Sequence, residues 1–392
     1  MKTLPVHRRY FVALWLAAML LAPRSAAAEE ASAPGSERIA AALQPFVDSQ
    51  TLAGAVVLVA DKDKMLCVET VGYADVAAKK PMPADALFWI ASQSKPITAT
   101  ALMMLVDEGK IDVEDPVAKY LPEFNELWRA AEQDGDHVLL KKPRRAVTVR
   151  NLLSHTSGLP FKSDLEQPTL DLLPLRVGAL SYAMTPLLFE PNSQFRYSNA
   201  GINTAGRIIE VVSGMAYEDF FDQHLFRPLG MRDTTFWPNE EQLSRLAKSY
   251  KPGQDNAGLE ETIVTQLKYP LDDRRRQPMP AGGLFSTAAD VARFCQMALR
   301  GGELGGKRYL SESAVKQMTS KQTPETLKDQ YGFGWATGGE VFGHGGAYAT
   351  NMSIDPKRAL ITVFMVQHAG FPGNGRESLA AFRKAAEAEF RN

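Results

Sequence analysis

Cysteine is scarce in this 392-residue chain, and its charges nearly cancel. It has two cysteines, Cys67 and Cys295, and 44 Lys and Arg against 45 Asp and Glu. Two cysteines cannot build a disulfide framework or a cysteine-based zinc site. We expect no Cys67–Cys295 disulfide, because two specific positions would have to meet the required geometry. Without a basic excess, the chain has no general attraction for nucleic acid or for anionic membranes.

Several motifs of cofactor-dependent enzymes are absent. The six histidines are scattered and none lies in a His-Glu-x-x-His motif, so the sequence predicts no catalytic metal. No Gly-x-Gly-x-x-Gly follows a strand-like segment, and no phosphate-binding loop is present, so we expect no cofactor. Gly-x-Ser-x-Gly is also missing, which excludes the usual nucleophile turn of α/β-hydrolases.

The apolar run near the N-terminus, Tyr10 to Ala22, is too short for a membrane span of about 20 residues. Lys2, Arg8 and Arg9 precede it and small residues follow, an order typical of a secretory signal peptide (residues 1–28) cleaved after Ala28. The Arg8-Arg9 pair leaves general and twin-arginine export open. Cleavage would leave 364 residues of the 392 with 40 basic and 45 acidic side chains. We expect a periplasmic or secreted protein without a stable membrane anchor.

Strand-like segments lie near both ends of the chain, at 53–60, 65–71, 347–354 and 360–366. Helical patterns occupy 37–46, 92–108, 200–213, 217–224, 287–300 and 376–390. If the terminal strands pair in one sheet, the middle of the chain is an insertion. The sequence therefore predicts an α+β fold, with an antiparallel sheet built from both termini, flanked by helices, and a mainly helical inserted lobe.

We expect residues 29–392 to form a single domain. Its sheet lobe would comprise about 37–115 and 280–392, and its helical lobe about 116–279. The charged stretches 123–145 and 253–276 are expected to be irregular surface loops or lids. The arginine run 274–276 is interpreted as solvated rather than as an attractor of acidic substrates.

The sequence Ser92-Gln93-Ser94-Lys95 begins the helical pattern at 92–108. Residues three apart share a helix face, so the Lys95 side chain is expected beside the Ser92 hydroxyl. Free N–H groups at a helix N-terminus favour an oxyanion there. A desolvated lysine with a lowered pKa can accept a serine proton. Alone, however, the tetrapeptide is better explained as a helix cap followed by a solvated lysine.

Two further motifs change this interpretation. Tyr197-Ser198-Asn199 lies 105 residues after Ser92, just before a predicted helix, and His344-Gly345-Gly346 lies 147 residues after Tyr197 and leads into a predicted strand. In this order the motifs match the three active-site elements of serine β-lactamases and penicillin-binding enzymes. Similar context at 105–121, 152–159 and 282–290 extends the match. From about residue 37 to 366, the sequence resembles the class C β-lactamase-like family of serine hydrolases.

The resemblance implies an acyl-enzyme mechanism with Ser92 as the catalytic nucleophile. Lys95 and Tyr197 would share the proton transfers, with Tyr197 favoured as the base toward Ser92 and toward the deacylating water; which of the two starts protonated is open. Asn199 would bind the acyl side of the substrate by hydrogen bonds. The backbone N–H groups of Ser92 and Ala347 would form the oxyanion hole.

His344 departs from the class C β-lactamases, which typically carry Lys at this position. His-x-Gly is more similar to the D,D-peptidase, D-aminopeptidase and family VIII carboxylesterase branches. A neutral imidazole has no fixed charge, so the preference for carboxylate-bearing substrates should be weaker. Gly345 and Gly346 would let a substrate approach the strand edge. His344, Gly345 and Gly346 are therefore predicted to bind substrate.

The favoured function is an exported carboxylesterase acting on small acyl esters. A D,D-peptidase or D-aminopeptidase and a β-lactamase are the enzymatic alternatives, so the expected partner is a small ester, amide or lactam. A non-catalytic protein that binds wall fragments or β-lactams is the alternative of another class. The joint presence of Ser92, Lys95 and Tyr197 favours an enzyme.

Other conspicuous residues have simpler interpretations. His155, in Leu-Ser-His-Thr-Ser-Gly, is expected to pack or to hydrogen-bond within a loop. Trp335 and Tyr348 fit a pocket wall and a core equally well. Cys67 and Cys295 have no basic sequence neighbours, so we expect neither to be catalytic.

Overall fold

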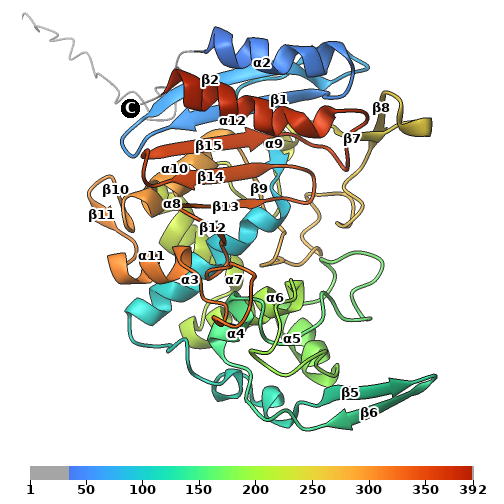
Figure 1. Cartoon of the computed structure of the whole chain (residues 1–392), viewed down its shortest axis with the longest axis vertical. Coiled ribbons are helices and arrows are strands. Elements are labelled where there is room, and N and C mark those ends of the chain that lie inside the picture. Colours follow the sequence, from blue (N-terminus) through green and yellow to red (C-terminus); the bar gives the residue numbers. More distant parts are fainter. Residues whose placement is uncertain (1–34, 391–392) are drawn as a thin grey trace, which may run out of the picture.

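The computed structural model describes residues 35–390, so the predicted signal peptide and its cleavage site lie outside the described residues. Within this range no helix is both long and apolar enough to cross a membrane. Seven strands pair antiparallel in the order β12-β13-β14-β15-β1-β2-β3 (Figure 1). They are β1 (Gly54–Ala60), β2 (Met65–Asp75), β3 (Lys80–Pro81), β12 (Ala336–Gly338), β13 (Val341–Gly345), β14 (Asn351–Asp355) and β15 (Leu360–Met365).

Strands from the two ends of the chain are neighbours in this sheet. β1 pairs with β15, with Val56 opposite Met365 and Ala60 opposite Ile361, and on its other edge with β2. Every residue of β1 is buried, which explains why its sequence is a continuous apolar run rather than an alternating one. The predicted sheet built from both termini is confirmed. The predicted strand at 347–354 is shorter than expected, because residues 346–350 form the turn between β13 and β14.

Helices cover both faces of the sheet. α2 (Glu37–Asp48) and α12 (Ser378–Glu389) lie side by side over one face, where they pack on Val57 and its neighbours (Figure 1). α10 (Ala288–Leu299) packs on the other face, in the core that contains Leu58. Because successive β1 side chains point to opposite faces, one strand contributes to both cores.

The two cysteines are free and lie in different cores. Cys67 belongs to the cluster under α2 and α12, whereas Cys295 belongs to the cluster around α10. Burial raises the pKa of Cys67 to about 12 and also raises the pKa of Cys295. Both thiols therefore act as small buried hydrophobic groups.

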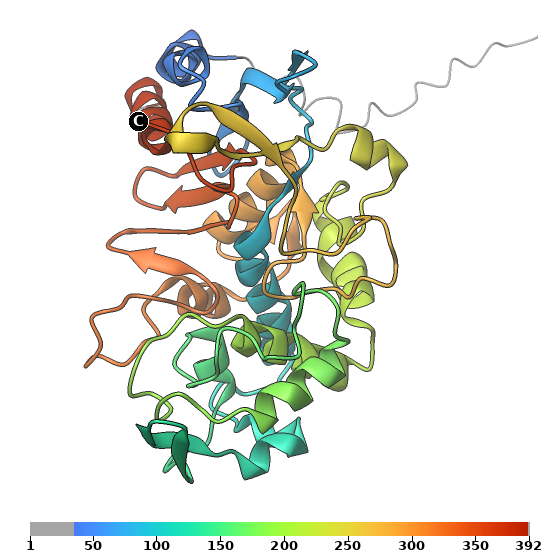
Figure 2. The same ribbon diagram turned by 90° about the vertical axis from the view of Figure 1, so that its right-hand side faces the viewer.

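Several of the remaining helices form the lower part of the molecule in Figure 1, whereas α9 lies in its upper part beside the sheet, and α3 runs from the sheet into the lower part, as Figure 2 also shows. α3 packs against α6 and α11. The helices are α3 (Ser94–Asp107), α4 (Val149–Leu153), α5 (Leu175–Met184), α6 (Asn199–Ser213), α7 (Tyr217–Phe221), α8 (Arg227–Leu229), α9 (Glu240–Ser244) and α11 (Glu312–Thr319). The predicted combination of a terminal sheet and an inserted helical region is thus observed.

The first stretch expected to be an irregular loop forms a hairpin, whereas the second contains one short strand and is otherwise loop and turn, as expected. In the first, β5 (Arg129–Asp134) pairs with β6 (His137–Lys141), and in the second β8 (Leu259–Thr262) pairs with β7 (Ser249–Pro252). Asp134 pairs with His137 across a two-residue turn in which Gly135 has a φ of 54°. The two turn residues are Gly135 and Asp136, and Gly-Asp between strands is a hairpin signal that the high charge of the segment obscured. Two further small antiparallel pairs are β4 (Phe88–Trp89) with the distant β9 (Phe285–Ser286) and the hairpin of β10 (Glu303–Leu304) with β11 (Lys307–Arg308).

The expectation of a solvated arginine run is wrong for Arg276, which is 1% exposed. Its Nε donates to Asp171 Oδ2 at 2.7 Å, and its Nη1 donates to the Phe236 carbonyl at 3.0 Å. Since Asp171 is also buried, the pair is a charged link inside the protein that joins two loops.

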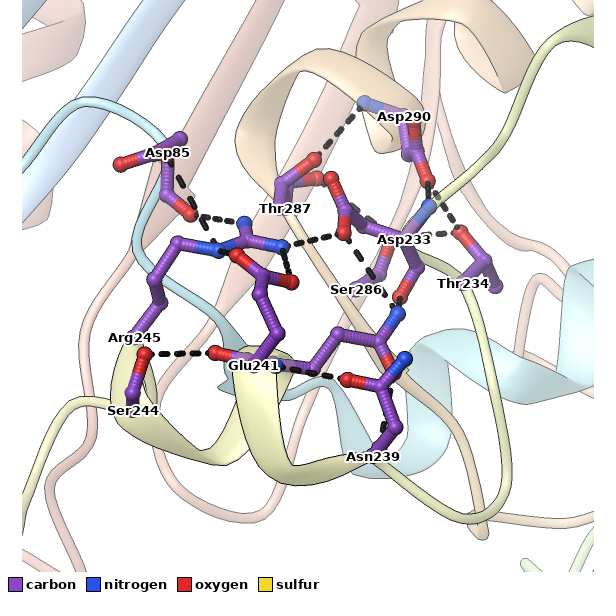
Figure 3. A network of polar contacts seen from close by, with 11 residues as sticks. Asp85, Asp233, Thr234, Asn239, Glu241, Ser244, Arg245, Ser286, Thr287 and Asp290 are labelled. Atoms are coloured by element: carbon purple, nitrogen blue, oxygen red, sulfur yellow. Dashed lines mark hydrogen bonds and ion pairs between the residues drawn. The ribbon is translucent and has the colours of Figure 1, made fainter.

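A polar network anchors the segment that leads into β4 (Figure 3). Arg245 donates to Asp233 and to Glu241, and Asp290 accepts from the Asp233 N–H at 2.8 Å. The Arg245 carbonyl in turn accepts the Leu87 N–H at 2.9 Å. Burial raises the pKa of Asp290 to about 7. The network fixes α9 and the start of α10 against the strand that ends three residues before Ser92.

Candidate active site

Ser92 lies in a 3-10 turn, Ala91–Gln93, between β4 and α3. Ala91 has a φ of 46°, in the left-handed region that non-glycine residues rarely adopt. The turn is held because the Ile90 N–H donates to the Leu284 carbonyl and the Ser94 hydroxyl donates to the Ala91 carbonyl at 2.7 Å. Residues 91 and 93–100 are buried, whereas Ser92 is half-buried. The strained turn thus presents Ser92 from an otherwise enclosed segment.

Lys95 lies one turn further along, with its side chain fully buried. Its Nζ is 3.2 Å from Ser92 Oγ, 2.8 Å from Asn199 Oδ1 and 2.7 Å from the Ala281 carbonyl oxygen. Burial holds the pKa of Lys95 well below its ordinary value of 10.5.

The hydrogen-bond inventory around Lys95 fits a neutral amine. The Asn199 and Ala281 oxygens can only accept, so together they take two N–H groups. In the ammonium form a third N–H donates to Ser92 Oγ, whereas in the neutral form a lone pair is left for the Ser92 hydroxyl. In the neutral form the amine can accept a proton from Ser92.

Tyr197 lies next to the Lys95 amine, which is 4.6 Å from the centre of its ring. Ser198 holds the turn before α6, because its hydroxyl accepts the Gly201 N–H at 3.0 Å and donates to the Pro160 carbonyl at 2.6 Å. Burial raises the pKa of Tyr197 well above 10, and a hydrogen bond with the Ser92 side chain offsets only part of this. Tyr197 is therefore a neutral phenol beside Ser92.

His155 supports the Tyr197 turn through packing and through a hydrogen bond. It is fully buried, its Nδ1 accepts the Ser198 N–H at 3.2 Å, and its ring lies 4.5 Å from the Tyr197 ring. Burial holds the pKa of His155 well below its ordinary value, so the ring is neutral. Both expected roles, packing and loop hydrogen bonding, are observed.

His344 lies within β13 rather than before a strand, and it is 7% exposed. Its Nδ1 is 2.6 Å from the Gly345 carbonyl oxygen and its Nε2 is 2.9 Å from the Tyr331 hydroxyl. A carbonyl only accepts, so Nδ1 carries the proton. Nε2 then faces the Tyr331 hydroxyl as an acceptor and shares its one proton with the Gly334 carbonyl oxygen, 3.1 Å from that hydroxyl. Burial lowers the pKa of His344 to about 3. The structure therefore places a neutral imidazole here, with both nitrogens facing the protein.

Gly346 brings the end of β13 against the Ser92 turn. A Cβ at this position would lie 2.6 Å from the Ile90 carbonyl oxygen and 2.2 Å from Thr350 Oγ1, so no side chain fits. At Gly345, by contrast, the nearest atom to an added Cβ would be 3.6 Å away. The backbone of Ala347 follows directly, and its role with the Ser92 N–H in an oxyanion hole stays a prediction.

Sequence reasoning missed the contribution of Ala281 and Tyr331. Ala281 acts through its carbonyl, which no side-chain motif reveals, although Gly282 and Gly283 next to it belong to the family-like segment 282–290. Tyr331 is fully enclosed near His344 and has no neighbouring motif. Trp335 stacks on Phe294 in the core, while Tyr348 packs edge-on against Trp89, so both are core residues.

Among residues 35–390, no cluster of three or more His, Cys, Asp or Glu side chains could hold a metal ion.

The chain matches the Beta-lactamase family over residues 39–387. It is 30% identical over 362 residues to esterase EstB of Burkholderia gladioli, covering 85% of this chain and 83% of EstB.

Two solved structures have the same fold. EstCE1, a hydrolase with promiscuous acyltransferase activity, is 25% identical with a TM-score of 0.74, covering 89% of this chain and 97% of EstCE1. A penicillin-binding protein homologue from Caulobacter crescentus is 22% identical with a TM-score of 0.70, covering 91% of this chain and 99% of its own.

Proposed function

The chain belongs to the beta-lactamase family of hydrolases, and from this premise we propose that it is an exported carboxylesterase that hydrolyses small acyl esters through an acyl-enzyme on Ser92. One observation carries the proposal: the buried Lys95 amine is 3.2 Å from Ser92 Oγ while two carbonyl oxygens occupy its N–H groups. In this proposal residues 29–392 work as one catalytic domain, with the predicted sheet lobe and helical lobe on either side of the site.

In the acylation step, neutral Lys95 accepts the hydroxyl proton as Ser92 Oγ attacks the ester carbonyl. This first transfer falls to Lys95 rather than to Tyr197, because burial keeps the phenol protonated. The backbone N–H groups of Ser92 and Ala347 would bind the oxyanion. On collapse, the bond to the alcohol breaks and Tyr197 gives its proton to the leaving oxygen. The Lys95 ammonium then returns a proton to Tyr197.

In the deacylation step, water replaces the alcohol. The Lys95–Tyr197 pair accepts a water proton as the hydroxide attacks the acyl carbonyl, and the Ser92 oxygen leaves and regains a proton from Lys95. The site thus begins and ends with a neutral amine and a neutral phenol. Asn199, whose Oδ1 is held by Lys95, would donate from its amide nitrogen to the acyl side of the substrate.

The environment of the site supports an uncharged ester rather than a carboxylate-bearing substrate. His344 is neutral and both of its nitrogens face protein groups, so it offers no fixed positive charge. The Phe161 ring, 45% exposed, lies 6.5 Å from the Tyr197 ring and provides an apolar surface for an acyl or alkyl group. The esterase relative EstB supports the same choice.

A three-substrate panel tests the proposal. Purified protein would be assayed with p-nitrophenyl butyrate, a chromogenic cephalosporin and a D-alanyl amide, together with Ser92→Ala. We expect the ester to have the highest kcat/KM and Ser92→Ala to abolish its turnover. Preference for the amide or the cephalosporin would favour the peptidase or the β-lactamase instead. No turnover of any substrate would favour the non-catalytic binding protein.

A further inference from the structure

We propose that Glu166, Tyr182 and Asn203 are positioning residues that hold the Ala281 carbonyl on Lys95 and thereby set the strength of Lys95 as a base. This inference rests on the proposed function, because it concerns the proton acceptor for Ser92. None of the three side chains belongs to the active-site motifs, and each comes from a different part of the helical region.

The three side chains form a continuous line of hydrogen bonds behind the Ala281 peptide. The Ala281 N–H donates to Asn203 Oδ1 at 3.0 Å, and Asn203 Nδ2 donates to the Tyr182 hydroxyl at 3.0 Å. The Tyr182 hydroxyl donates to Glu166 Oε1 at 2.8 Å. The other Glu166 oxygen, Oε2, accepts the Ser163 N–H at 2.7 Å. With the Lys95–Ala281 contact, the line connects the Lys95 amine to a buried carboxylate.

Every donor in this line points away from Lys95 and toward Glu166. An ionised carboxylate can only accept, so Tyr182 must donate to it, and the Tyr182 oxygen is then free to accept from Asn203. This fixes the Asn203 amide with its oxygen toward Ala281. The Ala281 N–H and the Ala281 carbonyl flank the same Cα, so the line that anchors the N–H also fixes where this carbonyl meets Lys95.

The line has two consequences for Lys95. The anchored Ala281 N–H fixes the carbonyl that occupies one lysine N–H, and so helps to keep the lone pair directed at Ser92. A carbonyl fixed beside the amine also favours the ammonium form, because it accepts from it, and this opposes the effect of burial on Lys95. If one of these hydrogen bonds is removed, the Lys95 amine should be a weaker base and its position beside Ser92 should be less well fixed.

All three side chains of this line are buried, so water does not compete for their hydrogen bonds. Glu166 and Tyr182 are each 2% exposed and Asn203 is 4% exposed. The same burial raises the pKa of the Glu166 carboxyl above its ordinary value, while the hydrogen bonds from Ser163 and Tyr182 oppose this. The Glu166 carboxylate thus serves two groups, since it accepts the Ser163 N–H in its own loop and ends the line from Ala281.

Tyr182→Phe tests the inference, because it removes only the hydroxyl that joins Asn203 to Glu166. The matched control is Tyr250→Phe, a buried tyrosine whose hydroxyl accepts the Val76 N–H at 2.8 Å near the sheet. The first readout is the rate at which a fluorophosphonate probe modifies Ser92, measured from about pH 5 to 9 on the full protein. The second is kcat and KM for p-nitrophenyl butyrate. Thermal unfolding confirms that each variant is folded.

We expect Tyr182→Phe to lower the plateau labelling rate and kcat about tenfold, with KM changed less than about twofold. The acid limb of the labelling profile should move to lower pH, because a weaker base loses its proton at lower pH. Tyr250→Phe should leave the rate and the profile unchanged. Glu166→Gln, which replaces the charged end of the line with an amide, should shift the limb in the same direction and serves if Tyr182→Phe does not fold.

The outcomes separate this inference from the proposed function. If Ser92 is not labelled even in the unmodified protein and no ester is hydrolysed, the proposed function fails. If the protein is active and Tyr182→Phe and Glu166→Gln keep its plateau rate and acid limb, the positioning role is overturned while the esterase assignment stands. A change in KM alone would likewise contradict the inference.

Discussion

A neutral Lys95 in the folded protein should make stability depend on pH in a way that Lys95→Met removes. The ordinary pKa of lysine is 10.5, and burial holds that of Lys95 well below this value. Between the two pKa values the unfolded chain binds more protons than the folded one, so the free energy of unfolding rises with pH. The maximal slope is about 1.4 kcal/mol per pH unit. From pH 7.5 to 9.5, wild type should gain up to about 2.6 kcal/mol relative to Lys95→Met.

The diagnostic quantity is the change with pH of the stability difference between wild type and Lys95→Met, rather than the size of that difference at one pH. Lys95→Met leaves the Asn199 and Ala281 oxygens without their donor, which costs about 1–3 kcal/mol for each buried group at any pH. Other titrating groups, including Asp290, are common to both proteins and cancel in the difference. The same variant should lose about 10²–10⁴-fold in kcat/KM for an ester, because it lacks the proton acceptor.

Urea unfolding followed by tryptophan fluorescence at pH 7.5, 8.5 and 9.5 measures this slope. Lys64→Met, at an exposed position in the β1–β2 turn, is the control and should show no pH-dependent difference from wild type. If the difference between wild type and Lys95→Met does not change with pH, Lys95 is charged in the folded protein. Its assignment as the first base would then be refuted.

Three further substitutions test separate parts of the site and fold. His344→Lys places an ammonium beside Tyr331 and should raise the ratio of cephalosporin to ester hydrolysis; an unchanged ratio would break the link between His344 and ester preference. Arg276→Leu leaves buried Asp171 without its cation and should cost about 3–5 kcal/mol in urea unfolding, whereas a loss below about 1 kcal/mol would argue against an essential ion pair. Gly346→Ala forces a Cβ to within 2.6 Å of the Ile90 carbonyl oxygen and should lower kcat/KM about 100-fold with the fold retained; near-normal activity in that variant would show that β13 need not lie so close to the Ser92 turn.

The sheet could be predicted from the sequence because its strands carry their own signals. β1 and β15 are continuous apolar runs at opposite ends of the chain, and their pairing follows from the need to bury both. The β5–β6 hairpin was missed because its segment is rich in charge and β6 is fully exposed, so only the Gly135-Asp136 turn marked it. Arg276 was misjudged because its partner, Asp171, lies 105 residues away in the sequence.

The candidate site was predictable where side chains carry the chemistry and not where the backbone or burial does. Ser92, Lys95, Tyr197 and Asn199 could be placed together from their motifs, and the structure brings all four into contact. The direction of proton transfer could not be derived, because it depends on how deeply Lys95 and Tyr197 are buried. The Ala281 carbonyl gives no signal in the sequence.

Mass spectrometry of the protein during ester turnover tests the central claim most directly. Samples quenched in acid after mixing with p-nitrophenyl butyrate would be digested and mapped for a butyryl group. The account predicts a butyryl ester on Ser92 that forms and decays at the rate of turnover and is absent in Ser92→Ala. Turnover without an adduct at Ser92, an adduct on another residue, or full activity in Ser92→Ala would contradict it.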